Sequence, residues 1–250
     1  MKKTRKELKI SARASLLGHY KTVITALLFS QLAALLLNIP FQRMAQQGIL
    51  YMVPSRIALG VLGSILVFLL SSLLQIGVSQ IHLQIARKQE TRLEHLFFAF
   101  RNNPDRFLGY SAVLLAAGLI CMFPGVLLLM LPSSGDTAVL LALTGGIVTA
   151  AGSVVLIVLL LSWALTPFLM LDHPELRVRE ALRNSRQLMR GQKSRLFILE
   201  LSFLGWILFS AFSMGIALLW VLPYMTQTLV WFYLELVPQT KEEVSDDSEH

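Results

Sequence analysis

Five long stretches of this 250-residue chain contain no Asp, Glu, Lys or Arg. A membrane-spanning helix needs about 20 consecutive apolar residues, and a helix in a soluble core rarely presents even one such run. Charged residues make up only 15% of the chain, whereas an average soluble domain carries about 25%. The sequence therefore predicts an all-α fold, a polytopic bundle of transmembrane helices. The five stretches are residues 22–42, 57–86, 107–135, 137–171 and 201–234.

The last of these stretches is too long to cross the membrane only once. A single helix over residues 196–234 would be roughly 58 Å long at 1.5 Å per residue, nearly twice the thickness of the hydrocarbon core, which is about 30 Å. Gly215 lies near its middle and can adopt the positive φ that a tight reversal needs. Dividing the stretch there gives six spans in a single transmembrane domain of residues 1–236. The spans are residues 22–41, 58–83, 108–131, 138–163, 196–212 and 216–234.

The stretch 137–171 is also long, but we do not divide it. Division would place the basic segment 177–195 outside the membrane, against the tendency of Lys and Arg to remain cytoplasmic. We expect instead that this helix bends or leaves the membrane near Pro167, since proline interrupts the helical hydrogen bonds.

The basic residues are distributed asymmetrically between the predicted loops. With a cytoplasmic N-terminus, 20 of the 22 Lys and Arg residues lie inside, and only Arg43 and Arg56 lie outside. Because basic loops stay on the cytoplasmic side, we expect both termini there. The formal net charge of +7 follows from this asymmetry, and without a nucleic-acid motif we expect no nucleic-acid partner. Residues 237–250 are acidic and lack apolar periodicity, which predicts a disordered tail.

The three cytoplasmic segments that precede an odd-numbered span share one design. Each has a short amphipathic stretch, a polar break and then a basic residue where the span begins. Lys21, Arg106 and Arg195 mark these starts, 85 and 89 residues apart. The pattern predicts cytoplasmic interfacial amphipathic helices and a possible three-fold hairpin repeat. Alternating topology alone would also place basic residues at these positions.

The third amphipathic stretch has the clearest helical periodicity. Pro174 suits its first turn, and Gly191 suits the position just past its end. One face consists of Val178, Ala181, Leu182, Ser185, Leu188 and Met189. A basic helix of this kind can bind anionic lipid headgroups or a protein partner, although a topology anchor packed against the bundle is the simpler interpretation. The candidate binding residues are Arg179, Arg183, Arg186, Arg190, Lys193 and Arg195.

Four polar side chains within the predicted spans are candidates for an intramembrane pathway: Glu200, Gln31, Gln75 and Gln227. A charge at the membrane centre costs about 2.5–3.5 kcal/mol, so Glu200 is a functional candidate. It lies near the end of its span, however, where it can reach the interface or pair with a basic residue. Hydrogen bonds between helices explain the glutamines equally well.

Residues for a recognisable chemistry are missing from the sequence. The single cysteine, Cys121, excludes an internal disulfide and a metal site with several cysteines. The zinc signature HExxH and the nucleophile signature GxSxG are both absent. We therefore expect no catalytic residues, no cofactor, no metal and no enzymatic activity.

Several short groups of residues in the C-terminal third resemble a known family. They are Asp172-His173-Pro174, Glu180-Ala181-Leu182, Ser185-Arg186, Leu188-Met189, Gly191, the run Leu201-Ser202-Phe203-Leu204-Gly205-Trp206, Gly215-Ile216, Leu219-Trp220 and Pro223-Tyr224. On these residues the chain resembles the domain-of-unknown-function family 975 over roughly residues 5–236. The resemblance implies a bacterial integral membrane protein with about six helices and no established activity. Arg177 departs from it, because relatives often have a small hydroxyl residue there that could cap the helix.

These observations favour a non-enzymatic helper, scaffold or regulator in the bacterial cell membrane that acts through its basic cytoplasmic face. Its expected partners are membrane lipids, chiefly anionic headgroups, with another membrane protein as a further candidate. The alternative is a small transporter or channel with a polar intramembrane pathway. A lipid-modifying enzyme is the weakest hypothesis, because no acid–base pair or metal cluster is apparent.

Overall fold

The computed structural model describes residues 3–131 and 134–237, and this part of the chain is helical with no strand. The predicted all-α fold is therefore confirmed. The predicted disordered tail lies outside the described residues, apart from Val237. The elements are α1 (Arg5–Leu16), α2 (Tyr20–Leu50), α3 (Pro54–Ala86), the 3-10 helix η1 (Leu93–Phe97), α4 (Phe98–Arg101), α5 (Pro104–Met130), α6 (Asp136–Trp163), α7 (Thr166–Asp172), α8 (Val178–Leu188), α9 (Lys193–Leu201), α10 (Leu204–Phe212) and α11 (Leu218–Leu236).

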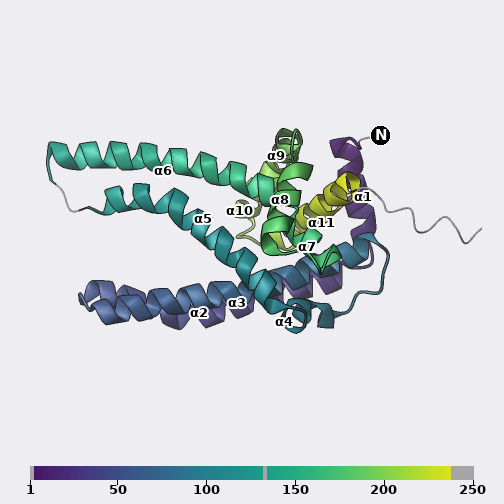
Figure 1. The fold of residues 1–250 in the computed structure, drawn as a ribbon, viewed down its shortest axis with the longest axis horizontal. Coiled ribbons are helices and arrows are strands. Elements are labelled where there is room, and N and C mark those ends of the chain that lie inside the picture. Colours follow the sequence, from purple (N-terminus) through teal and green to yellow (C-terminus); the bar gives the residue numbers. More distant parts are fainter. Residues whose placement is uncertain (1–2, 132–133, 238–250) are drawn as a thin grey trace, which may run out of the picture.

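Two long hairpins, α2–α3 and α5–α6, extend in the same direction from one wide end of the molecule (Figure 1). Within each hairpin the two backbones approach closely. A Cβ atom on Gly60 would lie 2.5 Å from the backbone nitrogen of Ala45, and one on Gly152 would collide with the carbonyl oxygen of Cys121. Small residues allow such close packing between membrane helices, so glycine is required at both positions.

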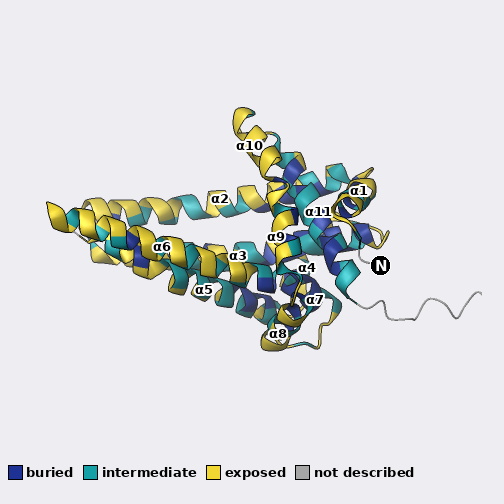
Figure 2. Ribbon diagram, turned by 90° about the horizontal axis from the view of Figure 1, so that it is seen from above, coloured by how far each residue is buried: buried dark blue, intermediate teal, exposed yellow. Residues whose placement is uncertain are grey.

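The hairpins expose apolar side chains, whereas buried residues concentrate at the wide end (Figure 2). Leu36, Ile120 and Ile147 are 65%, 74% and 68% exposed. A soluble protein rarely exposes apolar surface on this scale. The hairpin surfaces are therefore suited to contact with lipid, while the wide end has a packed core of its own.

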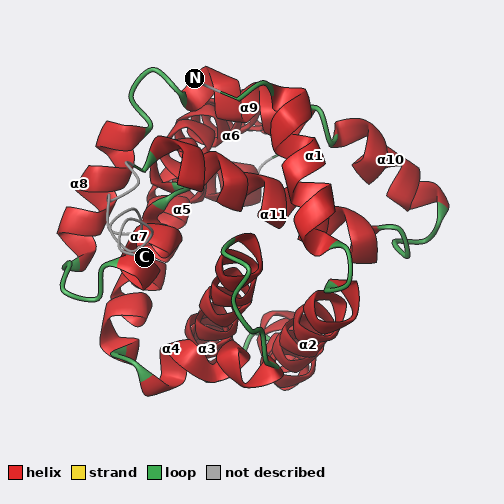
Figure 3. Cartoon of the chain, turned by 90° about the vertical axis from the view of Figure 1, so that its right-hand side faces the viewer, coloured by secondary structure: helices red, strands yellow, loops and turns green. Residues whose placement is uncertain are grey.

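The shorter helices gather at the wide end (Figure 1 and Figure 3). A hydrophobic cluster there joins α1, α7 and α11 through Leu8, Phe168 and Phe232, which are almost completely buried. The helix α11 lies beside α1 across this end (Figure 3). The indole Nε1–H of Trp231 in α11 donates to Ser15 Oγ over 3.1 Å. α11 is thus part of the packed core rather than an extension of the hairpins.

In the described part of the chain, five helical segments are long and apolar enough to cross a membrane by length and composition. The chain is therefore a membrane-spanning helical protein, as the sequence predicted. α11, which carries Gln227 and Glu235, is not among the five, so the count of six spans stays a prediction. The five segments are Tyr20–Leu50, Pro54–Ala86, Pro104–Met130, Asp136–Asp172 and Lys193–Phe212.

The last apolar stretch breaks at Gly215, as predicted. It also breaks between Leu201 and Leu204, where α9 ends and α10 begins, so the predicted span 196–212 consists of two helices. Gly215 has a φ of +87°, and its N–H donates to the carbonyl oxygen of Ser210 over 2.8 Å. The helices on either side of Gly215, α10 and α11, do not pack like the α2–α3 pair, because α10 projects from the side of the wide end (Figure 3). Ser210 is the one buried residue of α10. The three-fold hairpin repeat therefore stays a prediction.

The long fourth stretch bends near Pro167, also as predicted. α6 ends at Trp163, and α7 begins at Thr166 with Pro167 in its first turn. The expectation that Pro174 lies in the first turn of the third amphipathic helix is wrong, because α8 begins only at Val178. The carbonyl groups of His173 and Pro174 instead accept hydrogen bonds from Arg106 of α5. Gly191, with a φ of +75°, follows the end of α8 as expected.

We predict that Gly152→Ala destabilises the α5–α6 hairpin, because the new methyl group would collide with the backbone of Cys121. Overpacking of this kind typically costs about 1–3 kcal/mol. Gly146→Ala on the same helix is the matched control, because a Cβ atom there meets nothing within 4 Å. Thermal unfolding in detergent should show a lower midpoint for Gly152→Ala alone. Equal midpoints for both variants would contradict the close packing.

Candidate functional site

One carboxylate connects three helices at the wide end. Arg87 donates from Nη1 to Asp172 Oδ1 over 2.8 Å and from Nη2 to Oδ2 over 2.7 Å. The hydroxyl group of Tyr233 donates to the same Oδ2 over 2.6 Å. This group of three side chains, here called the Asp172 joint, links the C-terminal ends of α3 and α7 to α11. A bidentate Arg–carboxylate pair also fixes the angle between its partners.

A second ionic contact ties the N-terminal segment to the same end. Arg195 Nη2 donates to Glu235 Oε2 over 2.7 Å, and it also donates to the carbonyl oxygen of Lys3. The backbone N–H of Lys3 donates to Glu235 Oε1 over 3.1 Å. The side chains of Arg195 and Glu235 are 20% and 8% exposed. Arg195, a candidate for the binding surface, is thus used in a contact within the protein.

Arg106 makes a similar contact at the start of α5. Its guanidinium group donates to the carbonyl oxygen of Pro174 and, over 3.2 Å, to that of His173. Arg106 thus binds just past the C-terminal end of α7, and Arg195 binds Glu235 near that of α11, where a cation is favoured by the helix dipole. Lys21, the third residue of this predicted set, is exposed.

One face of α8 packs against the bundle. Ala181, Ser185 and Met189 are fully buried, and Ser185 Oγ donates to the carbonyl oxygen of Ser162 in α6 over 2.9 Å. Four of the candidate basic residues lie exposed on this helix or directly after it. None of them forms a salt bridge with an acidic side chain in the described ranges. We call this set the arginine face: Arg179, Arg183, Arg186 and Arg190.

The remaining candidate on this surface, Lys193, is the first residue of α9 and is half-buried. Arg177 is the N-terminal capping residue of α8, and its backbone N–H donates to a carboxylate oxygen of Glu180 over 2.9 Å. A carboxylate in the third helical position thus caps this helix, although the small hydroxyl residue of relatives is missing.

The four polar candidates within the predicted spans lie at separate places. Gln227 is buried against His82, with Oε1 2.7 Å from His82 Nδ1 and Nε2 donating to the His82 carbonyl oxygen over 3.3 Å. Gln31 and Gln75 are exposed on α2 and α3, and Glu200 is half-buried on α9. No hydrogen bond between described residues joins any two of the four. A polar pathway through them therefore gains no support from the structure.

A pocket of about 460 Å³ lies between α1, α10 and α11. Two cations and five aromatic rings line it, and sequence reasoning missed it because the contributing segments are about 200 residues apart in the chain. The available signal was the spacing of Lys9 and Arg13, which places both on one side of the first amphipathic helix. We call it the aromatic pocket. Its lining residues are Lys9, Arg13, Tyr20, Trp206, Phe209, Ala217, Trp220, Val221 and Tyr224.

A second pocket, of about 510 Å³, lies between α2, α3 and Leu115 of α5. Its lining includes Gln42 and Gln46 but none of the four intramembrane polar candidates. Across residues 3–131 and 134–237, no group of three or more His, Cys, Asp or Glu side chains is arranged to hold a metal ion.

A family model described as a protein of unknown function (DUF975) matches residues 1–240. No curated protein and no solved structure matches the chain.

We predict that Asp172→Asn destabilises the wide end, because an amide cannot satisfy both the guanidinium group of Arg87 and the hydroxyl group of Tyr233 as a carboxylate does. Arg87 is partly exposed, so water screens part of the effect; a loss of about 1–3 kcal/mol is expected. Asp136→Asn is the control, because Asp136 has no salt bridge with any described residue.

The two variants are compared by thermal unfolding in detergent. The double variant Arg87→Met with Asp172→Asn should lose less stability than the sum of the two single changes, since interacting side chains are not additive. Additive losses would mean that the Asp172 joint contributes no coupling between the helices.

Proposed function

The chain belongs to the family of proteins of unknown function DUF975, and we propose that it is a non-enzymatic scaffold or regulator of the bacterial cell membrane. It acts through the arginine face of α8, which binds anionic groups on the cytoplasmic side. The anionic headgroups of its own membrane are the first partner, and an acidic surface of another membrane protein is the second.

The observation that carries this proposal is the contrast between the two faces of α8. The buried face holds the helix to the bundle through Ala181, Ser185 and Met189. The arginine face is exposed, and no acidic side chain among the described residues pairs with it. Four guanidinium groups on a fixed helix can bind carboxylate or phosphate oxygens in bidentate geometry without a large loss of conformational freedom.

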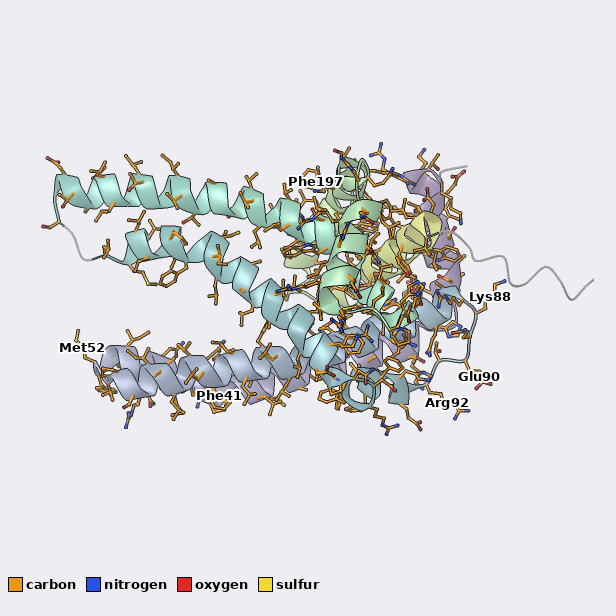
Figure 4. All side chains as sticks on the ribbon, in the orientation of Figure 1. Phe41, Met52, Lys88, Glu90, Arg92 and Phe197 are labelled. Carbon is orange, nitrogen blue, oxygen red and sulfur yellow. The ribbon has the colours of Figure 1, made fainter. Side chains whose placement is uncertain are left out.

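The cytoplasmic location is supported by the position of the basic segments. Lys88 and Arg92 lie at the wide end, whereas Met52 lies at the far tip of the first hairpin (Figure 4). α8 belongs to the wide end as well (Figure 1). Since Lys and Arg near membrane spans are retained on the cytoplasmic side, the wide end with its arginine face is cytoplasmic and the hairpin tips are external.

The size of the expected effect follows from the number of charges. Each Lys or Arg near an anionic membrane surface contributes about 1 kcal/mol, and the contribution falls off within a Debye length. Four arginines together therefore account for a preference of roughly a thousandfold for anionic over neutral surfaces. The preference should weaken strongly when the salt concentration rises.

We predict that replacing the four residues of the arginine face by Gln reduces the anionic lipid or acidic protein that co-purifies with the chain from its native membrane. The control replaces two other exposed arginines of the wide end, Arg92→Gln and Arg101→Gln. Bound lipids are quantified by mass spectrometry and proteins by proteomics. If the four-Gln variant retains the same lipids and proteins as the unchanged chain, the proposal is wrong.

The topology generates a separate prediction, tested with single cysteines in a Cys121→Ala background. With six spans, cysteines at Ser134 and Met214 react with an impermeant thiol reagent from outside, and a cysteine at Gln192 reacts only after the membrane is opened. Met214 is 94% exposed, so its reactivity reports its side of the membrane. Reaction of Met214→Cys only after opening would remove the last two spans from the topology.

A further inference from the structure

The aromatic pocket lies apart from the arginine face and is built by a break between two helices. α9 ends at Leu201 and α10 begins at Leu204. Phe203, in the break, is fully buried and packs edge-to-face against Tyr224, with the ring centroids 5.2 Å apart. The break directs α10 away from the bundle, so that Trp206 and Phe209 form one wall of the pocket.

The opposite walls come from α11 and α1. Trp220, Val221 and Tyr224 of α11 line the pocket together with Tyr20 at the start of α2. Trp206, Phe209 and Trp220 are each more than half exposed. These rings have a large apolar area that no described side chain covers. Tryptophan and tyrosine are favoured where a membrane meets water, because one part of the ring is apolar and the other is polar.

Two cations of α1 lie at the rim of the pocket. Lys9 Nζ is 4.0 Å from the ring centroid of Phe203 and donates to the carbonyl oxygen of Ser202 over 3.4 Å. Burial lowers the pKa of the Lys9 ammonium group; the nearby charge of Arg5 lowers it further, and Glu200 opposes the shift. Arg13 is exposed and has no salt bridge within the described part of the chain.

The charge balance at the rim favours an anion. Lys9 and Arg13 face the pocket, and the carboxylate of Glu200 offsets part of the Lys9 charge. Arg13 forms no salt bridge with a described acidic residue, so a net positive charge remains. Its guanidinium group matches the geometry of a phosphate. The volume of about 460 Å³ falls within the range of small-molecule sites, which is about 300–1,000 Å³.

We propose that the aromatic pocket binds one anionic phospholipid of the membrane that the chain spans. The phosphate lies between Lys9 and Arg13, and an acyl chain lies along Trp206, Phe209 and Trp220. A membrane lipid is the occupant because α10 is apolar on every side and only Ser210 is buried, so this wall of the pocket is open to the bilayer. The site does not depend on the arginine face.

The test is native mass spectrometry of the full-length protein in detergent, titrated with phosphatidylglycerol and, separately, with phosphatidylcholine of the same acyl chains. The unchanged protein should retain phosphatidylglycerol in preference to phosphatidylcholine. In Lys9→Gln with Arg13→Gln, this preference should fall roughly ten- to thirtyfold, because two cations are lost. The control, Arg5→Gln with Lys6→Gln, removes the same charge from the same helix and should keep the preference.

A second pair of substitutions tests the apolar wall. Trp206→Ala with Trp220→Ala should lower the retention of both lipids, because the acyl chain loses its contacts. The proposal is overturned if the Lys9 and Arg13 variant keeps its preference, if the control loses it equally, or if the tryptophan variant retains both lipids unchanged. Should the Lys9 and Arg13 variant not fold, Arg13→Gln alone decides, since Arg13 makes no salt bridge with a described residue.

The result of this lipid-binding test can be distinguished from a failure of the proposed function. The variant with Gln at all four positions of the arginine face should still bind phosphatidylglycerol at the aromatic pocket. Loss of this lipid in that variant would show that the measured binding belongs to α8, and it would also overturn the assignment of the lipid to the aromatic pocket.

Discussion

The carboxylate of Asp172 accepts hydrogen bonds from Arg87 and Tyr233, and so connects the C-terminal ends of α3 and α7 with α11. The hairpins themselves are largely exposed, and away from the wide end the contacts that hold each one together lie mainly between its own two helices. The geometry of the whole molecule therefore depends on the wide end. The Asp172 joint, the pair between Arg195 and Glu235, and the hydrophobic cluster around Phe232 act there together.

Features of the fold that depend on local sequence could be predicted. The apolar stretches, the break at Gly215 and the bend near Pro167 follow from hydropathy, length and the conformational limits of glycine and proline. The start of α8 was misplaced because a proline suits a first helical turn in general. Here the carbonyl groups of His173 and Pro174 accept hydrogen bonds from Arg106, which lies 67 and 68 residues away in the chain.

The candidate sites also separate into features that follow from local sequence and features that depend on contacts between distant segments. The arginine face was predicted because helical periodicity places its residues on one side of one helix. Arg195 carries the same charge, but its contacts with Glu235 and Lys3 connect distant segments that no local pattern joins. The aromatic pocket was missed for the same reason. The segments 196–212 and 216–234 were expected to form a hairpin, yet the break near Phe203, between α9 and α10, turns α10 away from the bundle and opens the pocket.

The arginine face and the cationic rim of the aromatic pocket lie on different helices of the same wide end, α8 and α1. The opposite face of each helix is buried against the bundle, which fixes the position of both surfaces. We propose that the arginine face binds anionic headgroups from this fixed position. A spin label at Gln187→Cys in a Cys121→Ala background reports this binding in nanodiscs of phosphatidylcholine with and without phosphatidylglycerol. The anionic lipid should slow the label and shield it from a water-soluble relaxation agent, and high salt should reverse both effects. Identical spectra and accessibility in the two lipid mixtures would contradict it.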